Sequence, residues 1–227
     1  MLFLIGGFTV LLILLVIAYP TRVAEILTFL IPSAVWRVQV AQPILALTFD
    51  DGPDPIYTPE VLRILAEQHV RATFFLVGER ARSYPEIVAA IRKAGHEIGN
   101  HSFSWRRTIS LGGTRFEEDL LRAESALGLE QQRKFFRPAG ILFRAVHPLI
   151  AKSHGYITVL GSGYAFDPYR PPVNFIVWAI SRAMRPGAIL VLHDSGGNRI
   201  NTVKALPKII QAARLRGLDF KCLSEII

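Results

Sequence analysis

From Val38 onward the sequence alternates short apolar runs with longer amphipathic stretches, and this alternation restricts the possible folds more than any other feature. About seven such pairs follow one another without an internal linker, and repeated strand–helix units form a parallel sheet covered by helices. In a chain of this length, seven units favour closure over an open sheet. We therefore predict an α/β fold, a distorted (β/α)7 barrel related to the TIM barrel.

One strand of this barrel stands out, because its end carries two adjacent carboxylates. The apolar run Ile44–Leu47 is too short for a helix and predicts a buried strand. Asp50 and Asp51 follow it, and Gly52 and Pro53 then turn the chain. Consecutive residues at a strand end point in different directions, so one carboxylate can face a metal while the other faces a substrate or a water.

Further polar residues follow the other expected strands. Those at or just past a strand's carboxyl end are Asp50, Asp51, His101, Arg137, Asp167 and His193. Each has a structural interpretation of its own, such as an N-cap aspartate, a core histidine or a surface arginine. Because the carboxyl ends of barrel strands meet at one mouth, the shared position of all six favours a functional site there.

Charge and cysteine content exclude several classes of protein. The net charge is +8, which favours contact with anionic surfaces, but no basic run is interleaved with aromatic residues as in a nucleic-acid groove. We therefore expect no nucleic-acid partner. Cys222 is the single cysteine, so the chain can form no intrachain disulfide and no cysteine-based zinc site.

The N-terminal region differs from the rest in its hydrophobicity. Leu2–Tyr19 contains no charged residue and is long enough to nearly span a bilayer core. No Lys or Arg precedes Arg22 and no small-residue cleavage site follows, which favours an uncleaved membrane anchor over a signal peptide. Val23–Trp36 is interpreted as an interfacial segment or a linker. The expected division is an anchor and linker over 1–37 and one domain over 38–227.

Two local patterns predict details near the mouth. Thr58 followed by Pro59 is typical of a helix start, with Thr58 as the N-cap. The glycine-rich stretch 195–198 follows an expected strand and is interpreted as a flexible rim of the mouth.

The sequence also resembles a known family. The stretches "LTFDDGP", "GHEIGNHS", "FFRPAG" and "ILVLHD" are similar, in this order, to the successive motifs of polysaccharide deacetylases with a NodB homology domain, the carbohydrate esterase 4 group. The resemblance covers about Ile44–Ile227. The family fold is a (β/α)7 barrel, in agreement with the number of strand–helix units.

The resemblance implies roles for particular residues. By this resemblance Asp50 is the catalytic base and Arg137 holds it, while His193 is the general acid and Asp167 orients it. Asp51 and His101 are ligands of a divalent metal, and zinc is the expected ion. The resemblance also implies that Leu190 and Leu192 line the pocket for the acetyl methyl group.

The second motif departs from the family pattern. The family places another metal ligand four residues after His101, where this chain has Trp105. An indole N–H only donates, so it cannot bind a metal. Ser104, His96 and Asp54 lie near in sequence and are alternative ligands, although none has the family spacing; waters that complete the metal shell are a further alternative.

Two main classes of function therefore remain open. The first is a metal-dependent hydrolase that removes N-acetyl or O-acyl groups from a polysaccharide such as peptidoglycan or a chitin-like glycan. The alternative is a catalytically weak or inactive, membrane-anchored carbohydrate-binding relative, in which Trp105 stacks on a sugar. A third, more remote class is an esterase or deacylase of a non-glycan substrate. In the first two classes we expect a monomer, anchored to a membrane by its N-terminal segment, with the domain on the extracytoplasmic side.

Overall fold

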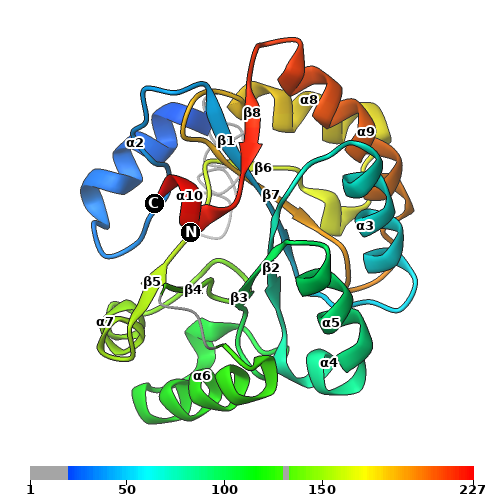
Figure 1. The fold of residues 1–227 in the computed structure, drawn as a ribbon. Helices are drawn as coiled ribbons and strands as arrows, with labels where there is room; N and C mark the ends of the chain where they lie inside the picture. The colour runs from blue at the N-terminus through cyan, green and yellow to red at the C-terminus, as the bar shows by residue number, and fades with distance from the viewer. Residues whose placement is uncertain (1–19, 130–132) are drawn as a thin grey trace, which may run out of the picture.

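The computed structural model describes residues 20–129 and 133–227, which form one parallel sheet surrounded by helices (Figure 1). The strands are β1 (Ile44–Asp50), β2 (Thr73–Leu76), β3 (Glu97–Asn100), β4 (Lys134–Phe136), β5 (Tyr156–Thr158), β6 (Gly163–Tyr164), β7 (Ile189–His193) and β8 (Asp219–Lys221). Their order is β5-β4-β3-β2-β1-β7-β6, and β8 pairs with the start of β1. All of these pairings are parallel, as the strand–helix alternation predicts.

The helices between strands lie on the outside of the sheet (Figure 1). They are α3 (Tyr57–Glu67), α4 (Gly78–Ser83), α5 (Pro85–Lys93), α6 (Gly113–Leu127), α7 (Val146–Ser153), α8 (Val173–Ala183) and α9 (Ile200–Arg214). Helix α2 (Pro20–Leu30) precedes β1, and α10 (Leu223–Ile226) follows β8. Two short 3-10 helices, η1 (Thr108–Ser110) and η2 (Asp167–Tyr169), lie in the loops after β3 and β6.

The barrel is distorted because its two edge strands do not meet. Among the described residues β5 and β6 form no ladder with each other. The segment after α2 lies between the end of β5 and the residues before β7: Val35 forms a parallel bridge with Val159, and the N–H of Val38 donates to the carbonyl of Gly187. The predicted distorted (β/α)7 barrel is therefore confirmed, with an N-terminal segment closing the gap.

The two faces of β1 pack into two different cores. Leu45 and Leu47 belong to the large core between sheet and helices, whereas Ala46 packs inside the barrel with Phe75 and Ile189. This division follows from the alternation of side chains along a strand. The inner core also contains side chains of α10, which lies beside the start of β1. One end of the barrel interior is thus filled, and the carboxyl ends of the strands form the other end.

The segment expected to be interfacial or a linker is packed against the domain. Most of it forms α2, and Ala24 and Trp36 pack in a small apolar cluster with Leu160. The expected anchor, Leu2–Tyr19, lies outside the described residues. Within residues 20–129 and 133–227, no helix is both long enough and apolar enough to cross a bilayer.

The predicted N-cap role of Thr58 is wrong. Helix α3 begins at Tyr57, two residues earlier than predicted, and the backbone N–H groups of Ile56 and Tyr57 donate to Oδ1 of Asp54 at 2.9 and 3.1 Å. The Thr58 hydroxyl instead donates to Oδ2 of the buried Asp194 at 2.6 Å. A buried carboxylate requires a donor, and this requirement decides where the hydroxyl points.

Candidate active site

Asp50 ends β1 inside the mouth and is almost completely buried. Its Oδ1 lies 2.6 Å from Nη1 of Arg137, which also donates to the hydroxyl of Thr48 at 2.7 Å. The other Arg137 nitrogens donate to the carbonyls of Val159 at 3.1 Å and Leu160 at 2.6 Å. Arg137 comes directly after β4, so two strands supply this ion pair. A buried charge needs such full pairing, and it fixes the position of the Asp50 carboxylate.

Asp51 points away from Asp50 because its backbone adopts φ +73°, in the left-handed region. This conformation is uncommon for a residue other than glycine. Its Oδ1 lies 3.4 Å from Nε2 of His101 and accepts a hydrogen bond from Nε1 of Trp105 at 3.1 Å. Burial acts to raise the pKa of Asp51, but the hydrogen bond and charge of His101, with smaller effects of His193 and Trp105, outweigh it and lower the pKa to about 2.

His101 follows β3 and is held by the backbone after β4. Its Nδ1 lies 2.8 Å from the carbonyl of Arg137. Because a carbonyl oxygen only accepts, Nδ1 carries a proton and Nε2 is the nitrogen that faces Asp51. Nε2 can donate a proton to the Asp51 carboxylate, or, without that proton, both groups can bind one cation. The orientation of Asp51 and His101 therefore allows the expected role as a pair of metal ligands.

A third protein ligand for this pair is missing from the part of the chain that the structure describes. No three His, Cys, Asp or Glu side chains among residues 20–129 and 133–227 are placed to hold one ion. The three alternative ligands are all engaged elsewhere, Asp54 with Arg80, Ser104 with Asp119, and His96 with the N–H of Ala72. A catalytic zinc generally has three protein ligands, so the residues present do not fit such a site.

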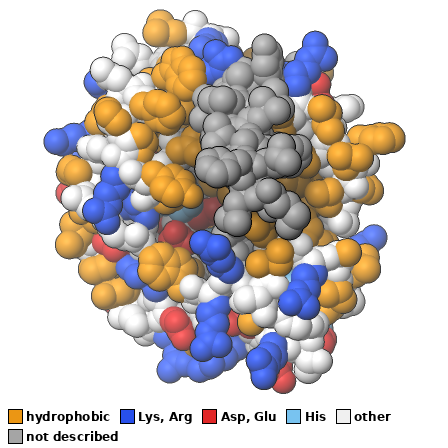
Figure 2. Space-filling model, turned by 180° about the vertical axis from the view of Figure 1, so that it is seen from behind, with side chains coloured by type: hydrophobic (Ala, Val, Ile, Leu, Met, Phe, Trp, Pro, Cys, Tyr) orange, Lys and Arg blue, Asp and Glu red, His pale blue; other side chains and the backbone are white. Residues whose placement is uncertain are grey.

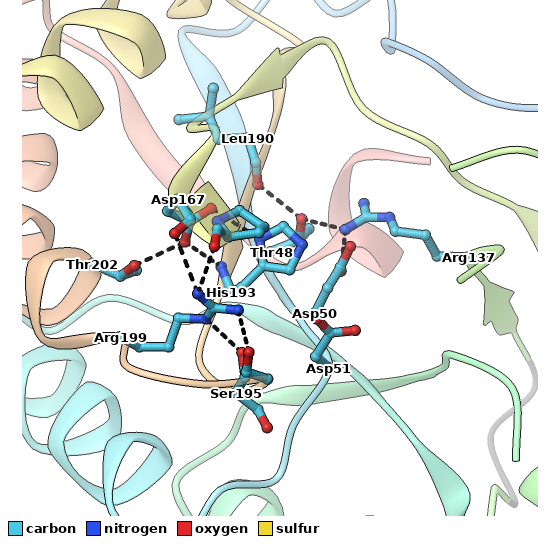
Figure 3. Close-up of polar contacts among 12 residues, drawn as sticks. Thr48, Asp50, Asp51, Arg137, Asp167, Leu190, His193, Ser195, Arg199 and Thr202 are labelled. Carbon is cyan, nitrogen blue, oxygen red and sulfur yellow. Dashed lines mark hydrogen bonds and ion pairs between the residues drawn. The ribbon is translucent and has the colours of Figure 1, made fainter. Parts of the chain in front are cut away.

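His193 ends β7 and is held by a carboxylate behind it. Its Nδ1 lies 2.9 Å from Oδ1 of Asp167, and Oδ2 of Asp167 accepts from the His193 N–H at 2.8 Å and from the Thr202 hydroxyl at 2.9 Å (Figure 3). Burial lowers the pKa of His193, but the charge and hydrogen bond of Asp167, together with the charges of Asp50 and Asp51, raise it to about 9. The ring is therefore protonated at neutral pH.

The strand register brings Asp50 and His193 together. They are Cα partners in the parallel ladder of β1 and β7, so both side chains leave the sheet on the same face. A carboxylate and a protonated imidazole thus stand side by side at the mouth. On the face opposite to that of Figure 1, acidic and histidine side chains lie at the bottom of a hollow between hydrophobic ones (Figure 2).

The predicted substrate-binding residues are placed differently from one another. Trp105 is 56% exposed, at the rim of the mouth. Leu190 and Leu192 are fully buried in the core between sheet and helices, on the face of β7 opposite to His193. By the same alternation Val191 shares the face of His193. In this structure, therefore, neither leucine side chain lines the mouth.

Arg199 is a site residue that sequence reasoning missed. It is almost completely buried, and its guanidinium donates to the carbonyls of Ser195 at 2.5 Å, Gly196 at 2.9 Å and Asp167 at 3.3 Å (Figure 3). A Cβ on Gly196 would lie 2.7 Å from the Trp105 ring, so this loop lies directly against the indole. The predicted flexible rim is thus tied to the segment that carries Asp167. No sequence signal distinguishes Arg199 from a surface arginine.

Asp194 is a second missed residue, although its position directly after His193 is a usable signal. Its side chain is fully buried, and a Cβ on Gly52 would lie 2.7 Å from its Oδ1. Burial raises its pKa to about 7, against the lowering effect of the Thr58 hydrogen bond. Asp194 therefore packs against the turn at Gly52, and its side chain does not enter the mouth.

Tyr164 is a third missed residue, on β6. Its hydroxyl is buried and has no hydrogen-bond partner within the described residues. Burial raises its pKa, and the charges of Arg137 and Asp50 both act on it. A buried donor near the Asp50–Arg137 pair remains for a water or a substrate atom to satisfy.

Comparison with known proteins gives one consistent family. The family model described as polysaccharide deacetylase matches residues 37–159. A peptidoglycan-N-acetylglucosamine deacetylase of Bacillus cereus is 37% identical over 85% of this chain and 92% of its own length. A chitooligosaccharide deacetylase of Sinorhizobium fredii is 34% identical over 83% of this chain and 94% of its own length.

Solved structures agree with this result. The crystal structure of a peptidoglycan N-acetylglucosamine deacetylase superimposes with a TM-score of 0.83 at 28% identity, covering 88% of this chain and 95% of that one. A mutant of a Bacillus anthracis CE4 family pseudoenzyme, with restored enzymatic activity, superimposes with a TM-score of 0.78 at 26% identity, covering 86% of this chain and 71% of that one. The fold thus occurs both in active deacetylases and in a relative described as a pseudoenzyme.

Proposed function

We propose that this chain, which belongs to the polysaccharide deacetylase family, removes acetyl groups from N-acetylglucosamine units of a glycan such as peptidoglycan or chitin oligomers. The observation that carries this proposal is the pairing of Asp50 with His193 across β1 and β7. Hydrolysis of an amide needs a base for the attacking water and an acid for the departing amine, and these two residues can supply both.

Asp50 and His193 act at opposite stages of the reaction. The carboxylate of Asp50, held by Arg137, accepts a proton from the water that attacks the acetamide carbon. Because Nδ1 of His193 is bound to Asp167, the other ring nitrogen, Nε2, is directed to the substrate. It donates its proton to the amine nitrogen as the C–N bond breaks, and acetate and a free amino sugar are released. Proton transfer of this kind contributes roughly 10²–10⁴-fold to a rate.

The first test is acetate release from N-acetylglucosamine oligomers by the purified full chain. We expect Asp50→Asn and His193→Asn each to lower kcat/KM by about 10²–10⁴-fold, since each removes one proton-transfer group. His69→Asn, at the end of α3, is the matched control and is expected to keep the full rate. Equal rates for all four proteins would refute the proposed roles.

The second candidate function is glycan binding without turnover, and the position of Trp105 favours it. The indole N–H bonds to the Asp51 oxygen that faces His101, where the family pattern has a metal ligand. An exposed aromatic ring at the rim can also stack on a sugar. Under this candidate the natural chain binds chitin oligomers but releases no acetate.

Trp105→His and Trp105→Phe separate the two candidates. The first restores a third ligand, and the second removes the N–H without adding one. We propose to measure bound zinc per chain by elemental mass spectrometry together with acetate release. Activity in the natural chain supports the deacetylase. Zinc uptake and acetate release that occur only with Trp105→His would support glycan binding as the natural function.

The location of this activity is a further part of the proposal. Leu2–Tyr19 would anchor the chain in a membrane, with the domain on the extracytoplasmic side where peptidoglycan lies. The absence of charge from this segment supports the anchor. Accessibility of the domain to protease in intact cells tests the orientation.

A further inference from the structure

An exposed apolar surface lies beside the mouth, and nothing in the deacetylase chemistry requires it. Three of its side chains come from α2 and two from the loop after β4; we call this set the apolar ridge: Ile26, Phe29, Leu30, Ile141 and Leu142. Phe29 is 84% exposed and Leu142 is 58% exposed. Clustered exposed apolar side chains of this size usually mark a contact surface.

Residues adjacent in sequence to the two parts of the ridge pack together. Phe143, next to Leu142, packs in the same apolar cluster as Leu27 and Ile31, which lie on or just after α2. The same cluster contains Leu160, which follows the carboxyl end of β5. Since the loop after β4 also leaves a carboxyl end, the ridge borders the mouth.

The surface next to the ridge is positively charged. Residues 102–112 and 139–146, the loops after β3 and β4, include three arginines and no acidic residue. These are Arg106, Arg107 and Arg144, and all three are exposed. Apolar groups flanked by cations match the interface of an anionic bilayer.

The sequence before α2 favours the bilayer as the occupant of this surface. The uncharged apolar stretch Leu2–Tyr19 ends immediately before Pro20, the first residue of α2. A chain that enters a membrane through this stretch brings α2 to the lipid surface. We propose that the apolar ridge lies in the interfacial region of an anionic membrane, with the mouth close to the lipid head groups.

This placement would limit the substrate to glycan at the membrane surface. A domain on a free tether could turn toward distant polymer, whereas a domain docked by its ridge presents Asp50 and His193 to chains next to the bilayer. The docking rests on the ridge and the N-terminal sequence and not on the proposed hydrolysis. The deacetylase assay and the docking experiment can therefore fail independently.

The test uses the full chain in vesicles of phosphatidylethanolamine and phosphatidylglycerol. Single cysteines replace Phe29 or Leu142 and carry an environment-sensitive fluorophore; the native Cys222 is buried and provides the labelling blank. Leu215→Cys is the matched control, because Leu215 is an exposed leucine (82%) at the end of α9. Quenching by lipids with a nitroxide on the acyl chain is then compared among the three sites.

We expect the labels at 29 and 142 to be quenched several-fold more strongly than the label at 215. Equal, weak quenching at all three sites in protein that floats with the vesicles would show a simple tether and overturn the proposal. Equal, strong quenching would also overturn it, because the contact would then have no defined face. A blue-shifted but unquenched label at 29 and 142 would indicate a second copy of the chain on the ridge and would equally refute membrane docking.

Discussion

The two sides of the mouth differ in how completely their polar atoms are paired. On the side of Asp50 and His193, each catalytic candidate has a buried partner, Arg137 or Asp167, bound within 3 Å. On the side of Asp51 and His101, Oδ1 of Asp51 lies 3.4 Å from Nε2 of His101, and its other partner is the exposed Trp105. The expected proton-transfer residues thus each have a buried charged partner, whereas the expected metal ligands lack a third ligand among the described residues.

The difference shows that the two parts of a hydrolytic site can vary separately. Arg137 and Asp167 are buried and hydrogen-bonded to several backbone or hydroxyl groups, so we expect replacement of either to disturb folding. Trp105 stands at the rim, more than half exposed, where a side chain can change without disturbing the core. Because Arg137 and Asp167 are buried, we expect substitutions on the side of Asp50 and His193 to be tolerated less well than substitutions of Trp105.

The largest effect is expected for Arg137→Ala. This change leaves the buried Asp50 carboxylate without its counter-charge and should lower the free energy of unfolding by about 3–5 kcal/mol. Denaturant unfolding followed by circular dichroism measures it, with the exposed Arg106→Ala as the control. If Arg137→Ala lowered the free energy of unfolding by less than about 1 kcal/mol, the side of Asp50 would be no better stabilised than the side of Asp51 and His101.

Asp167→Asn should change the titration of His193 next most strongly. Asp167 supplies the main interactions that raise the His193 pKa to about 9, so this pKa should fall toward its ordinary value near 6.5. NMR titration of the ring measures the shift directly. Thr202→Val, which removes only a hydrogen bond to Asp167, should move the pKa much less. An unchanged His193 pKa in Asp167→Asn would refute the pairing.

The stability of the natural chain should also depend on pH through His193. Its pKa is higher in the folded state than the ordinary value of 6.5, so the folded state binds the proton more tightly. This contribution is complete below about pH 6.5 and is lost as the pH rises through about 9. Unfolding free energies at pH 7 and pH 10 should therefore differ more in the natural chain than in His193→Gln.

The smallest effect is expected for Trp105→Phe. The indole donates one partly exposed hydrogen bond to Asp51, and its loss should cost about 1 kcal/mol or less. Trp178→Phe, another exposed tryptophan, is the control in the same unfolding measurement. A loss as large as that of Arg137→Ala would show that Trp105 is part of the core support of the mouth.

Much of this architecture could be predicted from the sequence. The strand–helix alternation predicts the parallel barrel, and the rule that barrel sites lie at carboxyl strand ends correctly groups Asp50, Asp51, His101 and His193. Strand alternation would also have placed Leu190 and Leu192 opposite to His193, had it been counted from that residue. These features depend only on the order of the residues and on the periodicity of apolar side chains, both of which can be read from the sequence.

Other features depend on partners that are distant in sequence. The Thr58 hydroxyl bonds to Asp194, 136 residues away, and Arg199 contacts the carbonyl of Asp167 from 32 residues away. The position of Trp105 shows the same limit, because its residue type excludes metal binding but only the fold aims its N–H at Asp51. The sequence by itself determined the barrel and the residues at its mouth, through periodicity and position. The tertiary structure alone decided which of them are paired, because pairing depends on distances between strands that only folding creates.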